Sequence, residues 1–232
     1  MSTKAKPSER KRGSGAQYVY TVLRDEILDL TLTPGSPIDE IRLSERLSMS
    51  RTPIREALVR LASEGLVTTL PNRSTVVSNI DFMNLHTFFD AMTLMFRVTT
   101  RLAAQFHTPA DLAAVRARQE EFAAAVDAQD ALAMIATNRE FHAEIARAGR
   151  NPYYEALCLR LLDEGRRLLR MYYQSFDDQL PNEYVQEHED LMLAIESRDI
   201  AQSDRLAKTH ADQIVHQIQT LISRDRRQHI DI

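Results

Sequence analysis

The chain has few cysteines, no long apolar runs and, beyond residue 80, almost no glycine. Cys158 is the only cysteine among 232 residues, which excludes an intrachain disulfide framework and fits a reducing compartment. No apolar run approaches the roughly 20 residues of a transmembrane helix, and no apolar segment follows the basic residues at the start. We therefore expect a cytoplasmic protein without a membrane span or a secretory signal.

The usual signatures of enzymes are also missing. We find no Ser-His-Asp set, no phosphate-binding glycine loop and no nucleotide fingerprint. The net charge is −4, but it is unevenly divided, because residues 1–80 carry 12 Lys and Arg against 9 Asp and Glu, while the remainder carries 17 against 24. A mildly basic part followed by an acidic part indicates two modules with different partners.

The basic part has the pattern of a small winged helix–turn–helix domain over residues 16–80. Residues 1–15 are polar and basic, and we expect a flexible arm that is either inert or contacts phosphates. Thr52 and Pro53 are the expected N-cap and first residue of the third helix, and Gly65 is expected to end it. Apolar spacing predicts three helices, at residues 16–30, 39–47 and 52–64. A hairpin of two short strands is predicted to follow, at residues 66–70 and 74–77.

The stretch "SRTPIREALVRL", residues 50–61, has one arginine-bearing face and one apolar face. Arg51 and Arg55 lie one turn apart, and an arginine can bind guanine O6 and N7 together in the major groove. Ser50 and Thr52 suit phosphate oxygens at a helix N-terminus, and Arg73 falls at the hairpin tip, where a wing reaches the flanking groove. A solvated arginine face is the alternative, but the ordered set of three helices and a wing favours DNA binding. The apolar face is formed by Ile54, Ala57, Leu58 and Leu61.

From residue 81 onward the sequence shows no strand pattern. We predict an all-α antiparallel bundle over residues 81–225 and a tail over residues 226–232, so the fold class is mainly α. Breaks at "HTPAD", "AQD", "GRNP", "DDQLPN" and "SRD" separate helices expected at about 82–106, 110–128, 130–148, 152–176, 182–197 and 199–225, with Asp81 as a possible cap of the first.

Histidines from separate helices of a bundle can converge on a divalent metal ion. His142, His188 and His210 lie on three predicted helices, and Asn138 precedes His142 by one helical turn. A structural role for these histidines is the alternative, and we expect one for the remaining His86, His107, His216 and His229. A metal-dependent helical enzyme is a further alternative, but Glu144 and Glu189, the nearest candidate bases, face away from the ligand histidines.

Residues 16–80 resemble the winged helix–turn–helix of the GntR family of bacterial transcription regulators. The similarity is strongest in "LSERLSMSRTPIREALVRLASEGLV". The resemblance implies a regulator, and in most relatives a repressor, that binds a palindromic operator as a homodimer. It also implies DNA contacts through Ser50, Arg51, Thr52 and Arg55, with the wing near Arg73. Ile41 departs from the family, since some members carry a DNA-contacting arginine there.

Residues 82–222 resemble the FCD ligand-binding domain of the FadR subfamily, through "FHAEIARAGRNPYY", "EHEDLMLAI" and the histidine of "AKTHADQI". Such domains often hold zinc or nickel through one Asp and three His and bind a carboxylate effector. The resemblance assigns the ligands to Asn138, His142, His188 and His210, with Asn in place of Asp.

Two residues of the first bundle helix depart from the FCD pattern. Met92 and Phe96 align with an effector-binding arginine and a glutamate, so we expect a more apolar pocket. We hypothesise an effector less acidic or more hydrophobic than a small dicarboxylate, unless Arg97 or Arg101 supplies the missing cation.

Overall fold

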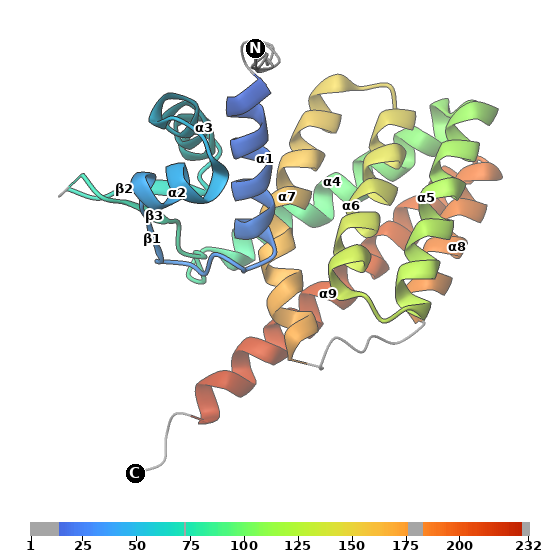
Figure 1. Cartoon of the computed structure of the whole chain (residues 1–232). Coiled ribbons are helices and arrows are strands. Elements are labelled where there is room, and N and C mark those ends of the chain that lie inside the picture. Colours follow the sequence, from blue (N-terminus) through green and yellow to red (C-terminus); the bar gives the residue numbers. More distant parts are fainter. Residues whose placement is uncertain (1–13, 72, 176–182, 229–232) are drawn as a thin grey trace, which may run out of the picture. The chain divides into compact units, whose positions relative to one another are not determined.

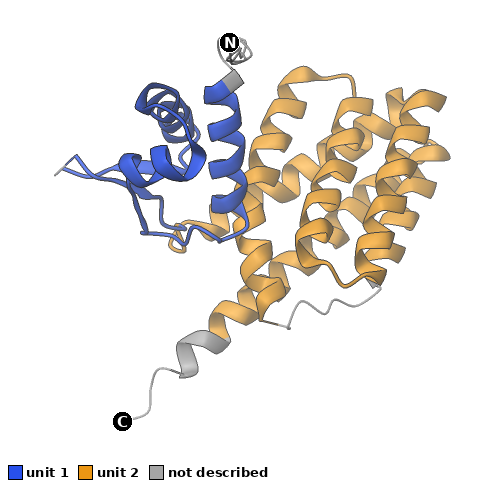
Figure 2. Cartoon of the chain, viewed as in Figure 1, with its two compact units in different colours: residues 1–80 blue, residues 81–232 orange. Residues whose placement is uncertain are grey.

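The computed structural model describes residues 14–71, 73–175 and 183–228, and it divides the chain into two units, residues 1–80 and 81–232 (Figure 2). Helices dominate both units, and the predicted mainly α class is confirmed (Figure 1). Most of the predicted arm and the last residues of the predicted tail lie outside the described residues. The last helix continues to Gln228, beyond the predicted end at residue 225.

The first unit contains the three predicted helices and the predicted hairpin, together with a short strand that we did not predict. The extra strand, β1, pairs antiparallel with β3 through Ile38 and Thr75, and the sheet order is β1-β3-β2. Its pairing is tertiary, since the local sequence "TPGSPI" contains only loop-forming signals. The elements are α1 (Ser14–Leu28), β1 (Pro37–Ile38), α2 (Glu40–Leu47), α3 (Arg51–Ser63), β2 (Val67–Thr69) and β3 (Thr75–Val77).

One apolar core holds these elements together. Val19, Leu23 and Ile27 recur every four residues along α1, so they form one stripe, and all three are fully buried. The predicted apolar face of α3 is buried in the same core. Gly65 follows α3 with left-handed backbone (φ +74°), and the next amide, of Leu66, donates to the carbonyl of Leu61. The apolar pattern therefore fixes how α3 is rotated and which of its residues face outward.

The second unit consists of helices throughout its described part. Side-chain caps lie at the predicted breaks: Thr108 and Asp111 form a capping box, Asp130 accepts from the Ala133 amide, and Asn151 caps the helix after it. Asp81 does not cap the first helix, as Asn84 is its N-cap. The helices are α4 (Leu85–Phe106), α5 (Pro109–Asp127), α6 (Ala131–Ala148), α7 (Pro152–Gln174), α8 (Glu183–Glu196) and α9 (Ile200–Gln228).

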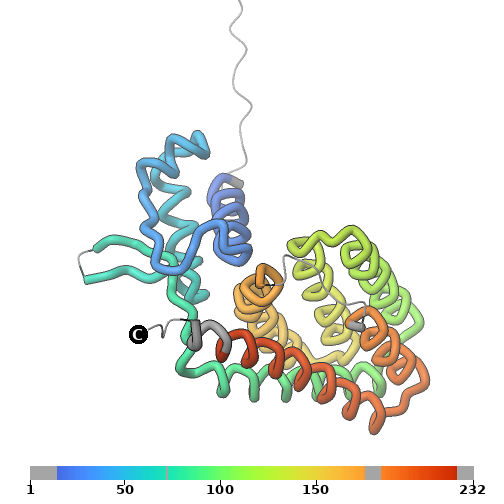
Figure 3. The backbone as a smooth tube through the Cα atoms, turned by 90° about the horizontal axis from the view of Figure 1, so that it is seen from below, coloured from blue at the N-terminus to red at the C-terminus, as the bar shows by residue number. Residues whose placement is uncertain are grey.

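Helices α4 and α9 run antiparallel and side by side along the bundle (Figure 3). The Arg97 guanidinium donates twice to the Asp204 carboxylate, at 3.0 and 2.8 Å. Near the C-terminus of α4, Arg198 donates to backbone carbonyls of that helix, at 2.9 Å to Gln105 and 2.9 Å to His107. These contacts satisfy carbonyls that a helix end leaves unpaired, and they fix the register of the two helices.

Candidate DNA-binding helix and three-histidine site

Helix α3 begins two residues earlier than the sequence predicted. Ser50, with extended backbone, is the N-cap, and Arg51 is the first helical residue, so the predicted cap at Thr52 is wrong. Pro53 is then the third helical residue, where its missing amide hydrogen removes no intrahelical bond, because the first four amides have no helical acceptor. The Ser50 side chain makes no capping hydrogen bond, and both Ser50 and Thr52 are exposed.

Arg51 and Arg55 are exposed, and neither belongs to the buried stripe of α3. Arg55 is not isolated, because its Nε donates to Glu40 Oε2 at 2.8 Å. Glu40 lies in the first turn of α2 and is held in place by that helix, whose N-cap is Asp39. The ion pair therefore directs the Arg55 guanidinium before any DNA is bound. Glu40 is a residue that our sequence reasoning missed.

Arg73 lies in the connection between β2 and β3, as predicted, and it is exposed. Its backbone has φ +66, and its amide donates to the Leu70 carbonyl at 2.8 Å. The Leu70 amide donates in turn to the Ser74 carbonyl at 2.9 Å. These bonds close the hairpin and leave the Arg73 side chain at its end.

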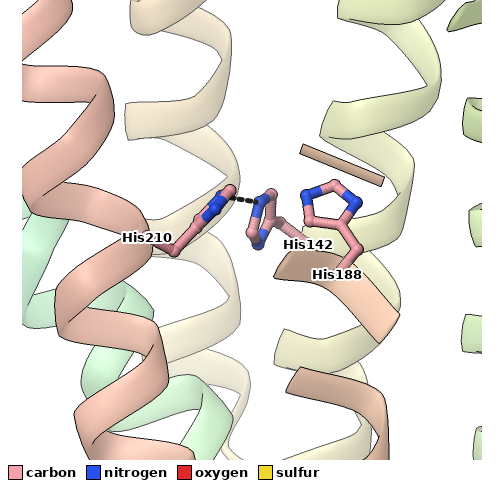
Figure 4. A group of neighbouring side chains, drawn as sticks. All are labelled: His142, His188 and His210. Carbon is pink, nitrogen blue, oxygen red and sulfur yellow. Dashed lines mark hydrogen bonds between the residues drawn. The ribbon is translucent and has the colours of Figure 1, made fainter. Parts of the chain in front are cut away.

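Three histidines predicted from separate helices come together inside the bundle. His142 of α6, His188 of α8 and His210 of α9 each offer a ring nitrogen, and these atoms lie within 4.8 Å of one another. Figure 4 shows the three rings extending from their helices toward one point, with His210 Nε2 3.2 Å from His142 Nε2. The side chains are 0–4% exposed. A cluster this deeply buried lies within the core of the unit.

Two polar residues orient the rings from outside the cluster. The Nδ1 of His188 lies 2.9 Å from Gln119 Oε1, and the amide of Gln119 is itself fixed by donation from Nε2 to the Val185 carbonyl at 3.0 Å. Because this leaves Gln119 Oε1 as the acceptor, His188 carries its proton on Nδ1 and a lone pair on Nε2. The Nδ1 of His210 lies 2.7 Å from Glu187 Oε2, the carboxylate–histidine arrangement common around metal sites.

The electrostatics keep two of the rings neutral. Desolvation, aided by the neighbouring His210, lowers the pKa of His142 well below 6.5, and burial with the other two rings lowers the pKa of His188 in the same direction. Neutral imidazole is the form that ligates a metal. His188 Nε2 is buried and has no hydrogen-bond partner among the described residues, which is unusual for a buried polar atom.

The residues present fit a divalent metal ion. Two nitrogens bound tetrahedrally to zinc at about 2.05 Å would lie roughly 3.4 Å apart, close to the 3.2 Å between the Nε2 atoms of His142 and His210. The unpartnered His188 Nε2 supplies a third ligand. Asn138 lies one turn before His142 on α6 and is 7% exposed.

A cavity of about 540 Å³, counting its open mouth, lies next to this cluster. Met92 and Phe96, which the FCD resemblance assigns to the effector pocket, are among its walls, and so is Asn138. Arg97 and Arg101 do not line it, and Arg97 is instead bound to Asp204. The remaining walls are mostly apolar: Phe88, Phe89, Ile135, Leu162, Leu168, Leu169, Ala211, Ile214, Val215 and Ile218, with Gly165 among them.

Two cations that the sequence reasoning did not consider line the cavity, from α6 and α7. Arg139 of α6 is held by Asp163, its Nε donating to Oδ1 at 2.9 Å, and by Glu140. Arg166 of α7 is 8% exposed. The run "GRRLLR" on a predicted helix was the available signal, since arginines so closely interleaved with leucines must in part turn inward.

This combination defines a class of protein: a winged helix–turn–helix unit followed in the chain by a helical unit with a ligand-sized cavity. Residues 16–77 match the profile of the bacterial regulatory proteins of the gntR family, and residues 88–213 match the FCD domain. The FCD match alone covers more than half of the chain. The chain therefore belongs to the GntR family, among the FadR-like members that carry an FCD domain, and it is a DNA-binding transcription regulator, not an enzyme.

Known relatives agree with this assignment. The chain is 24% identical to the HTH-type transcriptional repressor RspR of Escherichia coli K12. The alignment extends over 210 residues and covers 88% of this chain and 89% of RspR. The fold of this chain is similar to that of E. coli McbR/YncC, with a TM-score of 0.80 and 22% identity. The match covers 90% of this chain and 99% of McbR/YncC. A GntR protein from Rhodococcus sp. RHA1 matches with a TM-score of 0.75, 20% identity and coverage of 89% and 98%. Within the described residues, no helix is long and apolar enough to cross a membrane.

Proposed function

We propose that this regulator is a cytoplasmic repressor that binds a palindromic operator as a homodimer and is released by a small-molecule effector. The observation that carries this proposal is the cluster of three buried imidazoles beside an apolar cavity, in a chain whose other unit is a DNA-binding domain. The relative RspR is named a transcriptional repressor, which supports the sign of regulation. A two-fold symmetric protein with one recognition helix per subunit reads two half-sites, which supports the palindrome.

On DNA, the exposed residues of α3 divide into two roles. Arg51 and Arg55 are suited to base edges in the major groove, where an arginine binds guanine with two hydrogen bonds. Ser50 and Thr52, at the start of the helix, are suited to phosphate oxygens. Arg73 at the end of the hairpin contacts the flanking groove or its backbone. Each role predicts a different effect of substitution, as developed below.

In the bundle, His142, His188, His210 and Asn138 hold one divalent metal ion. Imidazole ligands suit zinc and nickel, and the ion supplies a positive charge that ties α6, α8 and α9 together. An asparagine oxygen in place of a carboxylate leaves this site with one negative charge less than the usual FCD set. Glu187 offsets part of this, since its carboxylate contacts His210 at 2.7 Å.

The effector is a carboxylate or related metabolite that is less acidic, or more hydrophobic, than a small dicarboxylate. Met92, Phe96 and the other apolar walls favour an apolar body, and Arg166 offers one buried cation for an anionic group. The cavity is lined from α4, α6, α7 and α9. A ligand in this cavity favours one of two arrangements of the bundle helices. That preference changes the spacing of the two DNA-reading helices in the dimer, and so couples effector binding to DNA binding.

Selection of duplexes from a random pool by the purified full chain tests the DNA-binding part. We expect an enriched inverted repeat, bound with an affinity that falls steeply as salt is raised, because phosphate contacts release counterions. Arg51→Ala and Arg55→Ala should each lose the repeat, whereas Arg160→Ala, an exposed arginine of α7, should keep it. A pool without an enriched repeat, or binding that does not respond to salt, would contradict the proposal.

A further inference from the structure

Phe96 separates the three histidines from the cavity. Its ring stacks on His142, with centroids 4.2 Å apart and planes 11° apart, and it lies 5.9 Å from the His210 ring at 26°. Phe96 is also a wall of the cavity. One aromatic side chain therefore contacts the histidine cluster with one part of its surface and the cavity with another.

The histidines do not reach the cavity surface. Its lining includes Phe96, Asn138 and Ala211, but none of the three histidines among the described residues. Their side chains are 4%, 0% and 2% exposed, for His142, His188 and His210 in turn. A molecule in the cavity thus meets Phe96 and Asn138, and not the ring nitrogens of the histidines.

We propose that Phe96 makes the metal site closed, so that the effector binds in the cavity without ligating the metal ion. This inference rests on the proposed metal and effector sites, and it assigns them separate tasks. The metal holds three helices together, while the cavity selects an apolar molecule through its own walls and Arg166. A structural metal site of this kind has all of its positions filled by protein, whereas a metal that binds substrate keeps one open.

The phenyl ring suits this role because of what it lacks. It offers no ligand atom, so a metal beside it gains no bond from that direction. It also cannot hydrogen-bond an anionic head group, which is then directed to the cations on the cavity wall, Arg139 and Arg166. Selectivity for chelating acids is lost, and selectivity for apolar anions takes its place.

Cobalt(II) absorption of the metal-substituted full chain tests the separation, with azide as a small anionic ligand. In the wild-type protein the visible cobalt bands should stay unchanged when azide is added, because Phe96 blocks its approach. Phe96→Ala joins the cavity to the metal, and azide should then shift the cobalt bands. The apparent affinity of this variant for azide should be at least about tenfold higher than that of the wild type. Phe96→Leu provides a second, smaller truncation should the alanine variant fail to fold.

Met92→Ala is the matched control. Met92 is on the same helix and lines the same cavity, but it makes no ring contact with a histidine, so this variant should resemble the wild type. An azide response in the wild-type protein equal to that of Phe96→Ala would overturn the inference while leaving the metal site intact. A chain that takes up no cobalt would instead contradict the metal site itself, and the inference with it.

Discussion

The proposed metal site predicts that Gln119 contributes to metal binding without being a ligand, and Gln119→Leu tests this prediction. The side chain is 1% exposed, and its Oε1 accepts from His188 Nδ1 at 2.9 Å. Leucine removes that acceptor. The buried Nδ1–H then stays unsatisfied, at a cost of about 1–3 kcal/mol, or the proton moves to Nε2 and blocks the lone pair that ligates.

Loss of an outer hydrogen bond of this kind lowers metal affinity about 10- to 100-fold, which corresponds to roughly 1.4–2.7 kcal/mol. Competition with a chromophoric zinc chelator measures the affinity, and circular dichroism checks the fold. Gln186→Leu, an exposed glutamine on α8, is the control and should leave the affinity unchanged. The reasoning is refuted if Gln119→Leu binds zinc as tightly as the wild type while His188→Ala has lost binding.

Four further outcomes are expected. Burial raises the pKa of the Cys158 thiol to about 12, so iodoacetamide at pH 8 should leave it unmodified in the folded protein and modify it in urea, as read by mass spectrometry. Glu40→Gln should release Arg55 and reduce the ratio of the affinities for operator and scrambled duplex about two- to fivefold, as measured by fluorescence anisotropy. This factor corresponds to the free energy of an exposed ion pair. Arg73→Ala should weaken binding to both duplexes alike and reduce the salt slope by about 0.9. Asn138→Asp should tighten zinc binding in the chelator assay, because it adds a negative ligand; equal or weaker binding would exclude Asn138 from the ligand set.

The sequence predicted the helices well because their signals are local. Apolar spacing placed the buried face of α3, and the breaks "HTPAD" and "GRNP" marked helix starts, where the structure has caps at Thr108 and Asn151. Strand β1 escaped prediction because its two residues, Pro37 and Ile38, carry no strand pattern, and only pairing with β3 makes them a strand. The wrong cap at Thr52 arose from Pro53, which is tolerated at more than one position of the first turn.

The candidate site was predictable only in part. Spacing put each of His142, His188 and His210 on a helix, but their convergence depended on the family resemblance, because periodicity does not tell which helices meet. Gln119 was out of reach for the same reason. It is a polar residue on an otherwise ordinary helix, and it becomes significant only through long-range packing against α8.

The metal content of untagged protein, purified without chelators, tests the central claim most directly. Elemental mass spectrometry of the full chain should find about one equivalent of zinc or nickel, and the same measurement on His142→Ala or His188→Ala should find much less. A wild-type protein that is empty, and that stays empty after incubation with zinc and with nickel, would contradict the claim that these three buried histidines form a metal centre.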